Sequence, residues 1–236
     1  MVVDGVTRKA ELATNLSKIK AEIPSGVHLI VVTKTFPLSD VELLHQLGVS
    51  EFGENRDQEG KLKAPKVPGK WHFQGQLQSN KLKSICTWAD VIQTIDSLRY
   101  VKLVSDSLIS INQSEPSAQS KSSGNLKILE VFIQVSLDAD ENRANRAGAK
   151  PEELDQIADA ILSTSNLKLQ GLMAVAPLDE KPESAFERLA KIHQRFIGKY
   201  PNSPNLSAGM SGDFKAAIAH GATHIRIGSQ ILGSRA

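Results

Sequence analysis

Short apolar segments alternate with amphipathic segments along nearly the whole chain. The first amphipathic segment covers residues 7–23, where Leu12, Leu16 and Ile19 share one face of a helix with a 3.6-residue period. Residues 27–33, which read VHLIVVT, form a short apolar run rich in β-branched side chains. Such a run is typical of a strand that is buried on both faces. The pattern therefore predicts a helix followed by a buried strand.

The same alternation continues to the C-terminus and predicts eight strands in all. The further strands are predicted over residues 51–53, 70–75, 90–95, 127–135, 167–175, 205–210 and 223–227. Helices are predicted between them over residues 40–47, 56–63, 79–86, 97–108, from Pro151 onward, 183–199, 212–220 and 230–232. Ser39 and Asp40 are predicted to cap the helix over 40–47, and Gly48 to end it.

Eight strands that alternate with helices are what a (β/α)8 barrel of the TIM type requires. The competing architecture, an open doubly wound sheet, often carries a G-x-G-x-x-G turn after its first strand. The chain contains neither that turn nor a G-x-x-x-x-G-K-[ST] loop. We therefore predict an α/β protein with a (β/α)8 barrel, an extra N-terminal helix, and one domain over residues 1–236.

One segment interrupts the alternation. Residues 113–125 read QSEPSAQSKSSGN and lack large apolar side chains. A Ser-rich run of this kind cannot contribute to a core, so it is predicted to be a mobile surface loop inside the domain.

Composition narrows the choice of partners and compartment. The chain of 236 residues is 40% hydrophobic and 23% charged, with a net charge of +2. Near-neutral charge gives no reason to expect binding to nucleic acid or to a membrane surface. The single cysteine, Cys86, suits a reducing compartment, and neither a signal peptide nor a long apolar span is visible. We expect a cytoplasmic protein.

In a barrel of this type the reactive side chains gather where the strands end. Lys34 follows the first strand directly, between two threonines. Burying an ammonium group is costly, and a partly desolvated lysine amine condenses readily with an aldehyde to form a Schiff base. The alternative is a lysine whose amine simply extends to solvent.

The next two predicted strands carry weaker candidates for site residues. Asn55 follows Gly53 and Glu54 in what is equally an ordinary turn. His72 lies between Trp71 and Phe73, which is typical of a core histidine as well as of a site residue.

The last two strands end in loops that suit an anion. The first loop reads SAGMSGD over residues 207–213, and the second begins at Arg226 and continues through Gly228 and Ser229. Both are followed by predicted helices, and many barrels bind a phosphate group with the loops after strands seven and eight. An aldehyde site at Lys34 and a phosphate site here together suggest pyridoxal 5'-phosphate (PLP).

Several motifs, in this order, resemble those of the PLP homeostasis proteins, also called the YggS or PROSC family. They are Val32-Thr33-Lys34-Thr35, Phe52-Gly53-Glu54-Asn55, Trp71-His72-Phe73-Gln74-Gly75, Leu77-Gln78-Ser79-Asn80-Lys81, Gly171-Leu172-Met173, Ser207-Ala208-Gly209-Met210-Ser211-Gly212-Asp213 and Arg226-Ile227-Gly228. The resemblance runs from about residue 8 to residue 235. It implies the barrel fold of the N-terminal part of alanine racemase.

The resemblance also implies roles for individual residues. It makes Lys34 the residue that holds PLP as a Schiff base and places Arg226 at the pyridine nitrogen. The remaining members of the predicted cofactor-binding set are Asn55, His72, Ser207, Met210, Ser211, Gly228 and Ser229. Of these, Ser211, Gly228 and Ser229 are expected to bind the phosphate group, Met210 to line the pocket and Asn55 to lie beside the cofactor.

The resemblance implies a non-catalytic role that concerns vitamin B6 and amino-acid balance. An arginine cannot readily give a proton to the pyridine nitrogen, so a carbanion next to the cofactor is poorly stabilised. Alanine racemase adds a second base, a tyrosine from a C-terminal domain, whereas this chain ends at Ala236 and its Tyr100 and Tyr200 are predicted on outer helices. We expect a monomeric PLP carrier, with apo PLP-dependent enzymes as candidate partners.

Other functions remain open from the sequence. They are a PLP-dependent racemase or lyase, a barrel that binds another phosphorylated metabolite, and a protein-binding module. A metal site is not expected, because the six histidines are dispersed and His220 and His224 straddle a predicted helix–strand boundary. The chain also departs from the family pattern at Arg56, where tyrosine is usual, and at Arg146-Ala147-Gly148 after the fifth strand.

Overall fold

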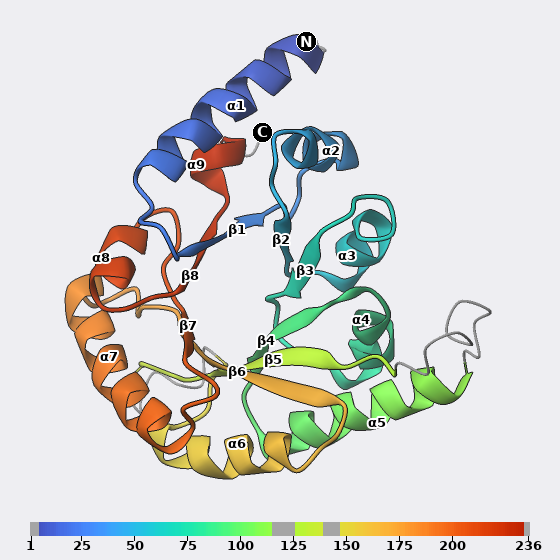
Figure 1. Cartoon of the computed structure of the whole chain (residues 1–236), viewed down its shortest axis with the longest axis vertical. Helices are drawn as coiled ribbons and strands as arrows, with labels where there is room; N and C mark the ends of the chain where they lie inside the picture. Colours follow the sequence, from blue (N-terminus) through green and yellow to red (C-terminus); the bar gives the residue numbers. More distant parts are fainter. Residues whose placement is uncertain (1–4, 115–125, 139–146, 234–236) are drawn as a thin grey trace.

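The computed structural model describes residues 5–114, 126–138 and 147–233. Eight parallel strands form a closed barrel in the order in which they occur in the chain, and β1 pairs with β8 to complete it (Figure 1). Helices cover the outside of this ring. The predicted (β/α)8 barrel is therefore confirmed. Most of the Ser-rich segment predicted over 113–125 lies outside the described residues.

The strands are short, as is typical of a barrel whose strands are tilted. They are β1 (His28–Val32), β2 (Glu51–Glu54), β3 (Lys70–Phe73), β4 (Val91–Ile95), β5 (Leu129–Gln134), β6 (Leu167–Met173), β7 (Asn205–Ser207) and β8 (His224–Ile227). The α-helices within the described part are α1 (Gly5–Ala21), α2 (Leu38–Gln46), α3 (Asp57–Lys63), α4 (Leu82–Trp88), α5 (Leu98–Ser114), α6 (Leu154–Leu162), α7 (Pro182–Lys199), α8 (Phe214–Ala219) and α9 (Ser229–Leu232). The 3-10 turns η1 (Ser79–Lys81) and η4 (Pro151–Glu153) precede α4 and α6.

The extra helix α1 packs against the last helix, α9, which spans only Ser229–Leu232. Both lie on the outside of the barrel next to β1, and α1 packs against α9 and α2 (Figure 1). Leu12 and Leu16 are buried in this contact. Arg8 donates hydrogen bonds to the Asp40 carboxylate and to the carbonyl oxygen of Leu232, so it connects the three helices.

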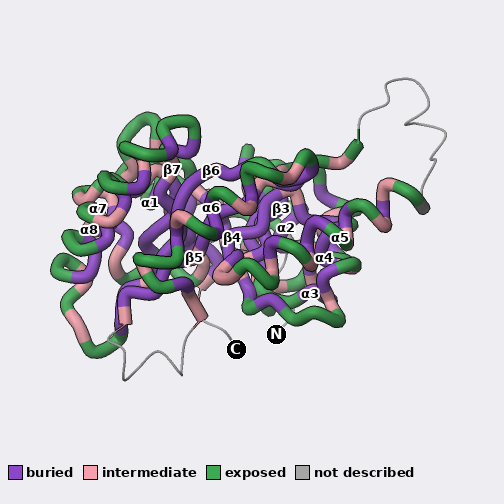
Figure 2. Tube along the Cα trace, turned by 90° about the horizontal axis from the view of Figure 1, so that it is seen from below, coloured by how far each residue is buried: buried purple, intermediate pink, exposed green. Residues whose placement is uncertain are grey.

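Two layers of side chains are buried in the molecule. One lies between the strands and the surrounding helices and is apolar, and it forms the main core (Figure 2). The other fills the barrel itself, where Val91, Phe132 and Met173 form a small apolar cluster. The barrel also encloses polar side chains, and His72 and Arg226 are among the buried ones.

Three local predictions need correction. The helix α2 begins at Leu38 with Pro37 at its N-cap, so Ser39 and Asp40 lie inside its first turn and do not cap it. The strand predicted over 205–210 ends at Ser207, because Gly209 adopts a left-handed φ of 93° that a strand cannot accommodate. The helix predicted over 97–108 continues to Ser114. Gly48 ends α2 as expected, with a left-handed φ of 81°.

Within the described residues, none of the helices is sufficiently long and apolar to pass through a lipid bilayer.

Candidate ligand site at the C-terminal mouth of the barrel

A cavity of about 360 Å³ opens where the strands end. This volume lies within the range of small-molecule sites, roughly 300–1,000 Å³. It is lined by Val32, Lys34, Phe36, Asn55, Gln74, Met173, Val175, Met210, Ser211, Gly212, Arg226, Gly228, Ser229 and Gly233. Seven of the nine residues predicted from the sequence are among them, although they come from four different strand ends.

The position of Lys34 is set by its two neighbours in the chain. Lys34 is half-buried and follows the end of β1. On one side, Thr33 donates a hydrogen bond from Oγ1 to Glu54 Oε1 at 2.6 Å. On the other, the N–H of Thr35 donates to Glu59 Oε2 at 2.6 Å. Thr35 has a φ of 69°, a left-handed conformation that costs a non-glycine residue about 1–2 kcal/mol and is held here by this bond.

These contacts come from a buried group that we call the outer cluster, made of Lys63, Glu54 and Glu59. It lies outside the barrel, because Lys63 and Glu59 belong to α3. The amine of Lys63 donates to Glu54 Oε1 at 2.7 Å, to Glu59 Oε2 at 3.0 Å and to the carbonyl oxygen of Thr33 at 2.9 Å. The outer cluster therefore binds both threonines beside Lys34.

The two carboxylates of the outer cluster titrate differently. Burial raises the pKa of Glu54 above its usual value, against hydrogen bonds from Lys63 and Thr33 that lower it. Burial is weaker at Glu59, and hydrogen bonds from Lys63 and from the N–H of Thr35 outweigh it, so the pKa of Glu59 is lowered. Within the part of the chain that the structure describes, Glu54 Oε2 is buried without a hydrogen-bond partner. The cluster therefore has more carboxylate than its single ammonium group satisfies.

Arg226 supplies a buried positive charge at the floor of the cavity. Its side chain donates from Nη1 to Ser207 Oγ at 2.8 Å and from Nη2 to the carbonyl oxygen of Ala174 at 2.9 Å. Burial lowers the pKa of Arg226 to about 10, so the guanidinium group stays protonated at neutral pH.

The loops after β7 and β8 provide small residues and hydroxyl groups. Met210 closes the first loop, since its N–H donates to the Asp213 carboxylate and its carbonyl oxygen accepts from the N–H of Phe214. In the second loop a Cβ on Gly228 would lie 3.2 Å from the carbonyl oxygen of Val32. That spacing is tight, so glycine allows the loop to approach β1. Ser211 and Ser229 line the cavity between the two loops.

Two residues of the predicted set do not reach the cavity. Ser207 and His72 are buried inside the barrel and are not among the residues that line it. Ser207 accepts a hydrogen bond from Arg226, and His72 contacts Glu51 and Gln93. The sequence placed both at strand ends, but the strand pleat directs their side chains below the cavity floor.

Gln74 also lines the cavity, although it was not predicted as a site residue. Its Nε2 atom is buried and has no hydrogen-bond partner among the described residues, so a donor is available toward a ligand. The signal was present in the alternation of β3, because His72 and Gln74 are two positions apart and share the face that points into the barrel.

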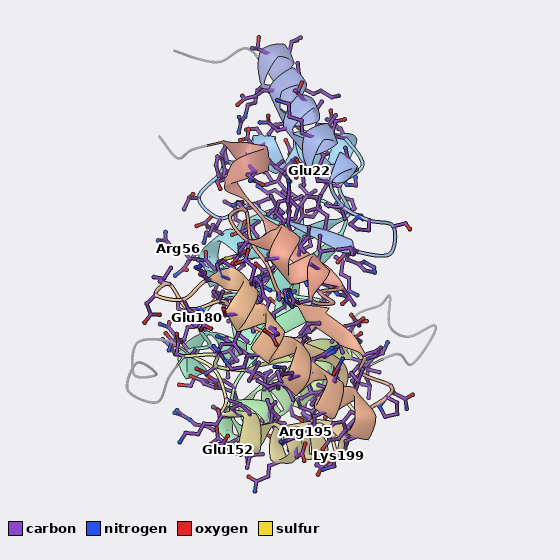
Figure 3. The ribbon with its side chains drawn as sticks, turned by 90° about the vertical axis from the view of Figure 1, so that its left-hand side faces the viewer. Glu22, Arg56, Glu152, Glu180, Arg195 and Lys199 are labelled. Carbon is purple, nitrogen blue, oxygen red and sulfur yellow. The ribbon has the colours of Figure 1, made fainter. Side chains whose placement is uncertain are left out.

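Other predicted features lie away from the cavity. Tyr100 in α5 donates to the carbonyl oxygen of Leu77, and Tyr200 at the end of α7 donates to Asp159, so both tyrosines are on the outer layer as expected. Arg56 points outward at the edge of the molecule (Figure 3), 3.9 Å from Glu59, and does not line the cavity. Arg146 lies outside the described residues, and Ala147 accepts a hydrogen bond from Gln134.

One group of possible metal ligands was not predicted. His28, Glu51 and His224 bring their ligand atoms within 4.8 Å of one another at the opposite mouth of the barrel. The rings of His28 and His224 are stacked 4.5 Å apart and nearly parallel, at 8°. The lone pairs of two parallel rings do not converge on one ion, so this arrangement is not a formed metal site. His220 and His224 are separated as expected, at the end of α8 and in β8.

Comparison with known sequences points to one family. Residues 8–236 match the family described as alanine racemase, N-terminal domain. The chain is 37% identical to the pyridoxal phosphate homeostasis protein of Corynebacterium glutamicum, over 90% of this chain and 92% of the relative. It is 35% identical to the protein of the same name from Vibrio cholerae, over 89% of this chain and 86% of the relative.

Comparison with solved structures agrees with the sequence comparison. The structure of PipY from Synechococcus elongatus with PLP bound has a TM-score of 0.79 and 26% identity, over 94% of this chain and 100% of that chain. An alanine racemase from Clostridium difficile in complex with cycloserine has a TM-score of 0.74 at 13% identity, which shows the shared fold alone. The match covers 96% of this chain and 60% of the racemase.

Proposed function

Because this chain belongs to the family of the alanine racemase N-terminal domain, and with it to the pyridoxal phosphate homeostasis proteins, we propose that it binds PLP in the cavity at the C-terminal mouth of the barrel. The observation that carries the proposal is that Lys34 and Arg226 line one cavity together with Ser211 and Ser229.

The donors around the cavity fit the parts of PLP. The amine of Lys34 would hold the aldehyde of PLP covalently. The hydroxyl groups of Ser211 and Ser229, with the glycine backbone beside them, suit the phosphate group. Arg226 is a permanent donor for the pyridine nitrogen, and Gln74 offers a further unpaired donor. The apolar walls formed by Val32 and Met173 suit the ring.

The residues around the site favour holding PLP over turning over an amino acid. PLP, when bound, supplies an electron sink for carbanions, and the sink is strong only when the pyridine nitrogen is protonated. Arg226 keeps its own proton at neutral pH and therefore donates a hydrogen bond without transferring the proton. Among the described residues, neither Tyr100 nor Tyr200 is near the cavity to act as a second base. We propose a carrier without efficient catalysis, in agreement with the names of the relatives.

The carrier role also implies recipients. We propose that a monomer of this protein delivers PLP to apo PLP-dependent enzymes in the cytoplasm. Met210 at the rim of the cavity is 41% exposed, which supports an entrance open to solvent. Mixing the PLP-loaded protein with an apo-transaminase should restore the transaminase faster than free PLP at the same concentration, and no acceleration would contradict delivery.

The proposed attachment is tested by borohydride reduction of the PLP-loaded protein followed by peptide mass mapping. We expect a phosphopyridoxyl group on Lys34, its loss in Lys34→Ala, and no change in Lys191→Ala, which removes an exposed lysine on α7. An adduct on another lysine, or none after incubation with PLP, would contradict the proposal. Exchange of the α-hydrogen of added amino acids into deuterated solvent would instead favour the racemase alternative.

A further inference from the structure

A continuous series of hydrogen bonds runs through the barrel from the cavity floor to the opposite mouth. We call it the interior chain. It begins at Arg226, whose Nη1 lies 2.8 Å from Ser207 Oγ, and Ser207 Oγ lies 2.8 Å from Gln93 Oε1. It continues from Gln93 Nε2 to His72 Nδ1 at 3.0 Å and ends with His72 Nε2 and Glu51 Oε2 at 3.0 Å. Beyond this end, His28 Nδ1 contacts the other oxygen of Glu51, Oε1, at 2.8 Å. The six residues come from six different strands. Only Arg226 has a part in the proposed function.

The two ends of the interior chain fix the direction of every bond within it. Arg226 can only donate, so Ser207 Oγ accepts from it and directs its own hydrogen to Gln93. Gln93 then uses its amide N–H₂ toward His72 Nδ1, which must accept. His72 therefore carries its proton on Nε2 and donates to Glu51, which can only accept.

The middle of the interior chain is buried and neutral, whereas its two ends, Arg226 and Glu51, are charged. Gln93 and Ser207 are fully buried, and His72 is 1% exposed. Burial lowers the pKa of His72, so the ring is neutral at pH 7. Burial opposes ionisation of Glu51, but hydrogen bonds from His72 and His28 overcome it and hold the pKa of Glu51 at about 2. The cation Arg226 is thus joined through neutral groups to an anion at the other mouth.

From this arrangement we propose that Ser207, Gln93, His72 and Glu51 are positioning residues for Arg226, and that they couple the cofactor site to the opposite mouth of the barrel. The inference rests on the proposed function, because it concerns how Arg226 meets the pyridine nitrogen. Without the acceptor at Ser207, Arg226 would keep one of its two side-chain contacts, the carbonyl oxygen of Ala174. Apolar side chains can fill a barrel interior, as Val91, Phe132 and Met173 do here, so packing alone does not require this series of polar groups.

The test compares two carboxylates at the same mouth. Glu51→Gln removes the anionic end of the interior chain and keeps a similar shape. Glu130→Gln is the matched control, because Glu130 lies near the start of β5 and pairs with Lys70 and Lys168 outside the interior chain. Both variants remove one negative charge from this mouth. A through-space effect of charge would therefore appear in both, and coupling through hydrogen bonds in Glu51→Gln alone.

The readouts are the dissociation constant for PLP and the pH at which the absorbance of bound PLP titrates. We expect Glu51→Gln to weaken binding about 2- to 30-fold, the usual range for coupling between distant sites, and to shift the absorbance titration to lower pH. Glu130→Gln is expected to stay within about twofold of the unmodified protein. Gln93→Leu breaks the interior chain in its middle and is expected to give a shift at least as large as Glu51→Gln.

A third readout needs no cofactor. The ring nitrogens of His72 report its tautomer by NMR, and we expect the Nε2–H form in the unmodified apo-protein, because Glu51 can only accept. The Nδ1–H form would contradict the bond directions on which the inference depends. Unchanged PLP affinity and titration in folded Glu51→Gln would overturn the inference, and this variant decides the matter if Gln93→Leu does not fold. Failure of the unmodified protein to bind PLP would instead overturn the proposed function, and is seen before any variant is made.

Discussion

Two polar networks meet at the cavity from opposite sides of the sheet, and they differ in how they balance charge. The outer cluster places Lys63 between Glu54 and Glu59, within 3.0 Å of each. The interior chain keeps its two charges, on Arg226 and Glu51, at opposite ends of three neutral side chains. The first holds the backbone on both sides of Lys34, and the second holds the guanidinium group of Arg226.

The difference reflects what each network positions. A backbone segment next to Lys34 needs a rigid anchor, and short contacts between full charges provide one even where a left-handed Thr35 must be held. In the proposed function Arg226 donates to a cofactor ring, and this role requires that its charge is not neutralised by a direct ion pair. Neutral partners such as Ser207 orient Arg226 without pairing its charge, and Glu51 compensates it from a distance.

The largest decrease in the free energy of unfolding is expected when the outer cluster loses its ammonium group, that of Lys63. Lys63→Met leaves Glu54 buried without its cation, and removing one partner of a buried pair typically costs about 3–5 kcal/mol. Urea denaturation measures the free energy of unfolding. Lys61→Met on the same helix, where the lysine is exposed, should change it by less than about 0.5 kcal/mol. A loss below about 1 kcal/mol for Lys63→Met would show that Glu54 needs no cation.

A smaller effect on stability is expected from breaking the interior chain. Gln93→Leu leaves Ser207 and His72 each with one unmatched group, and an unsatisfied buried polar group costs about 1–3 kcal/mol. We expect a loss of about 2 kcal/mol, because neutral groups adjust more easily than charged ones. Gln134→Leu is the control, since Gln134 is half-exposed and its side chain donates to the carbonyl oxygen of Ala147 outside the interior chain. Equal losses in the two variants would mean that the interior chain adds nothing to stability.

Acid should change the stability contributed by the titratable groups in and beside the two networks in different directions. Burial lowers the pKa of His224, beside Glu51, from 6.5 to about 3, so its contribution is present above pH 6.5 and is lost as the pH falls from 6.5 to 3. Glu51, with its pKa lowered from 4.5 to about 2, adds a loss between pH 4.5 and 2. In the outer cluster, Glu54 has a raised pKa and contributes more stability when it is protonated, whereas Glu59 has a lowered pKa and contributes less as the pH falls.

Thermal unfolding between pH 7.5 and 4.5 tests the contribution of His224, because that of Glu51 is lost at lower pH. The melting temperature of the unmodified protein should fall as the pH decreases, and His224→Asn should flatten that fall because the histidine is no longer protonated on unfolding. An unchanged slope in His224→Asn would assign the acid sensitivity to other groups.

The smallest change in the free energy of unfolding is expected for an exposed ion pair, with which both buried networks can be compared. Lys102 and Asp106 form an exposed ion pair within α5. Such pairs contribute about 0–1 kcal/mol, so Lys102→Ala should change the free energy of unfolding by less than about 0.5 kcal/mol in urea. If Lys102→Ala lowered the free energy of unfolding as much as Gln93→Leu does, buried and exposed polar contacts would contribute equally to stability, contrary to this prediction.

Much of the site could be predicted because it depends on local order in the chain. Strand ends meet at one mouth in any (β/α)8 barrel, so Lys34, Asn55, Ser211, Arg226 and Ser229 were brought together by counting strands. Gln74 was missed although its alternation with His72 was visible. Without the register, nothing showed which face of β3 points inward.

The sequence by itself therefore determined the alternation of elements, the barrel and the residues at its C-terminal mouth, because these follow from local periodicity and chain direction. Only the tertiary structure decided which polar side chains meet inside. Ser207 and Gln93 are 114 positions apart in the chain and belong to strands that are not neighbours in the sheet. Their contact exists because closure of the barrel brings opposite walls together, and no local pattern encodes the register at which that closure occurs.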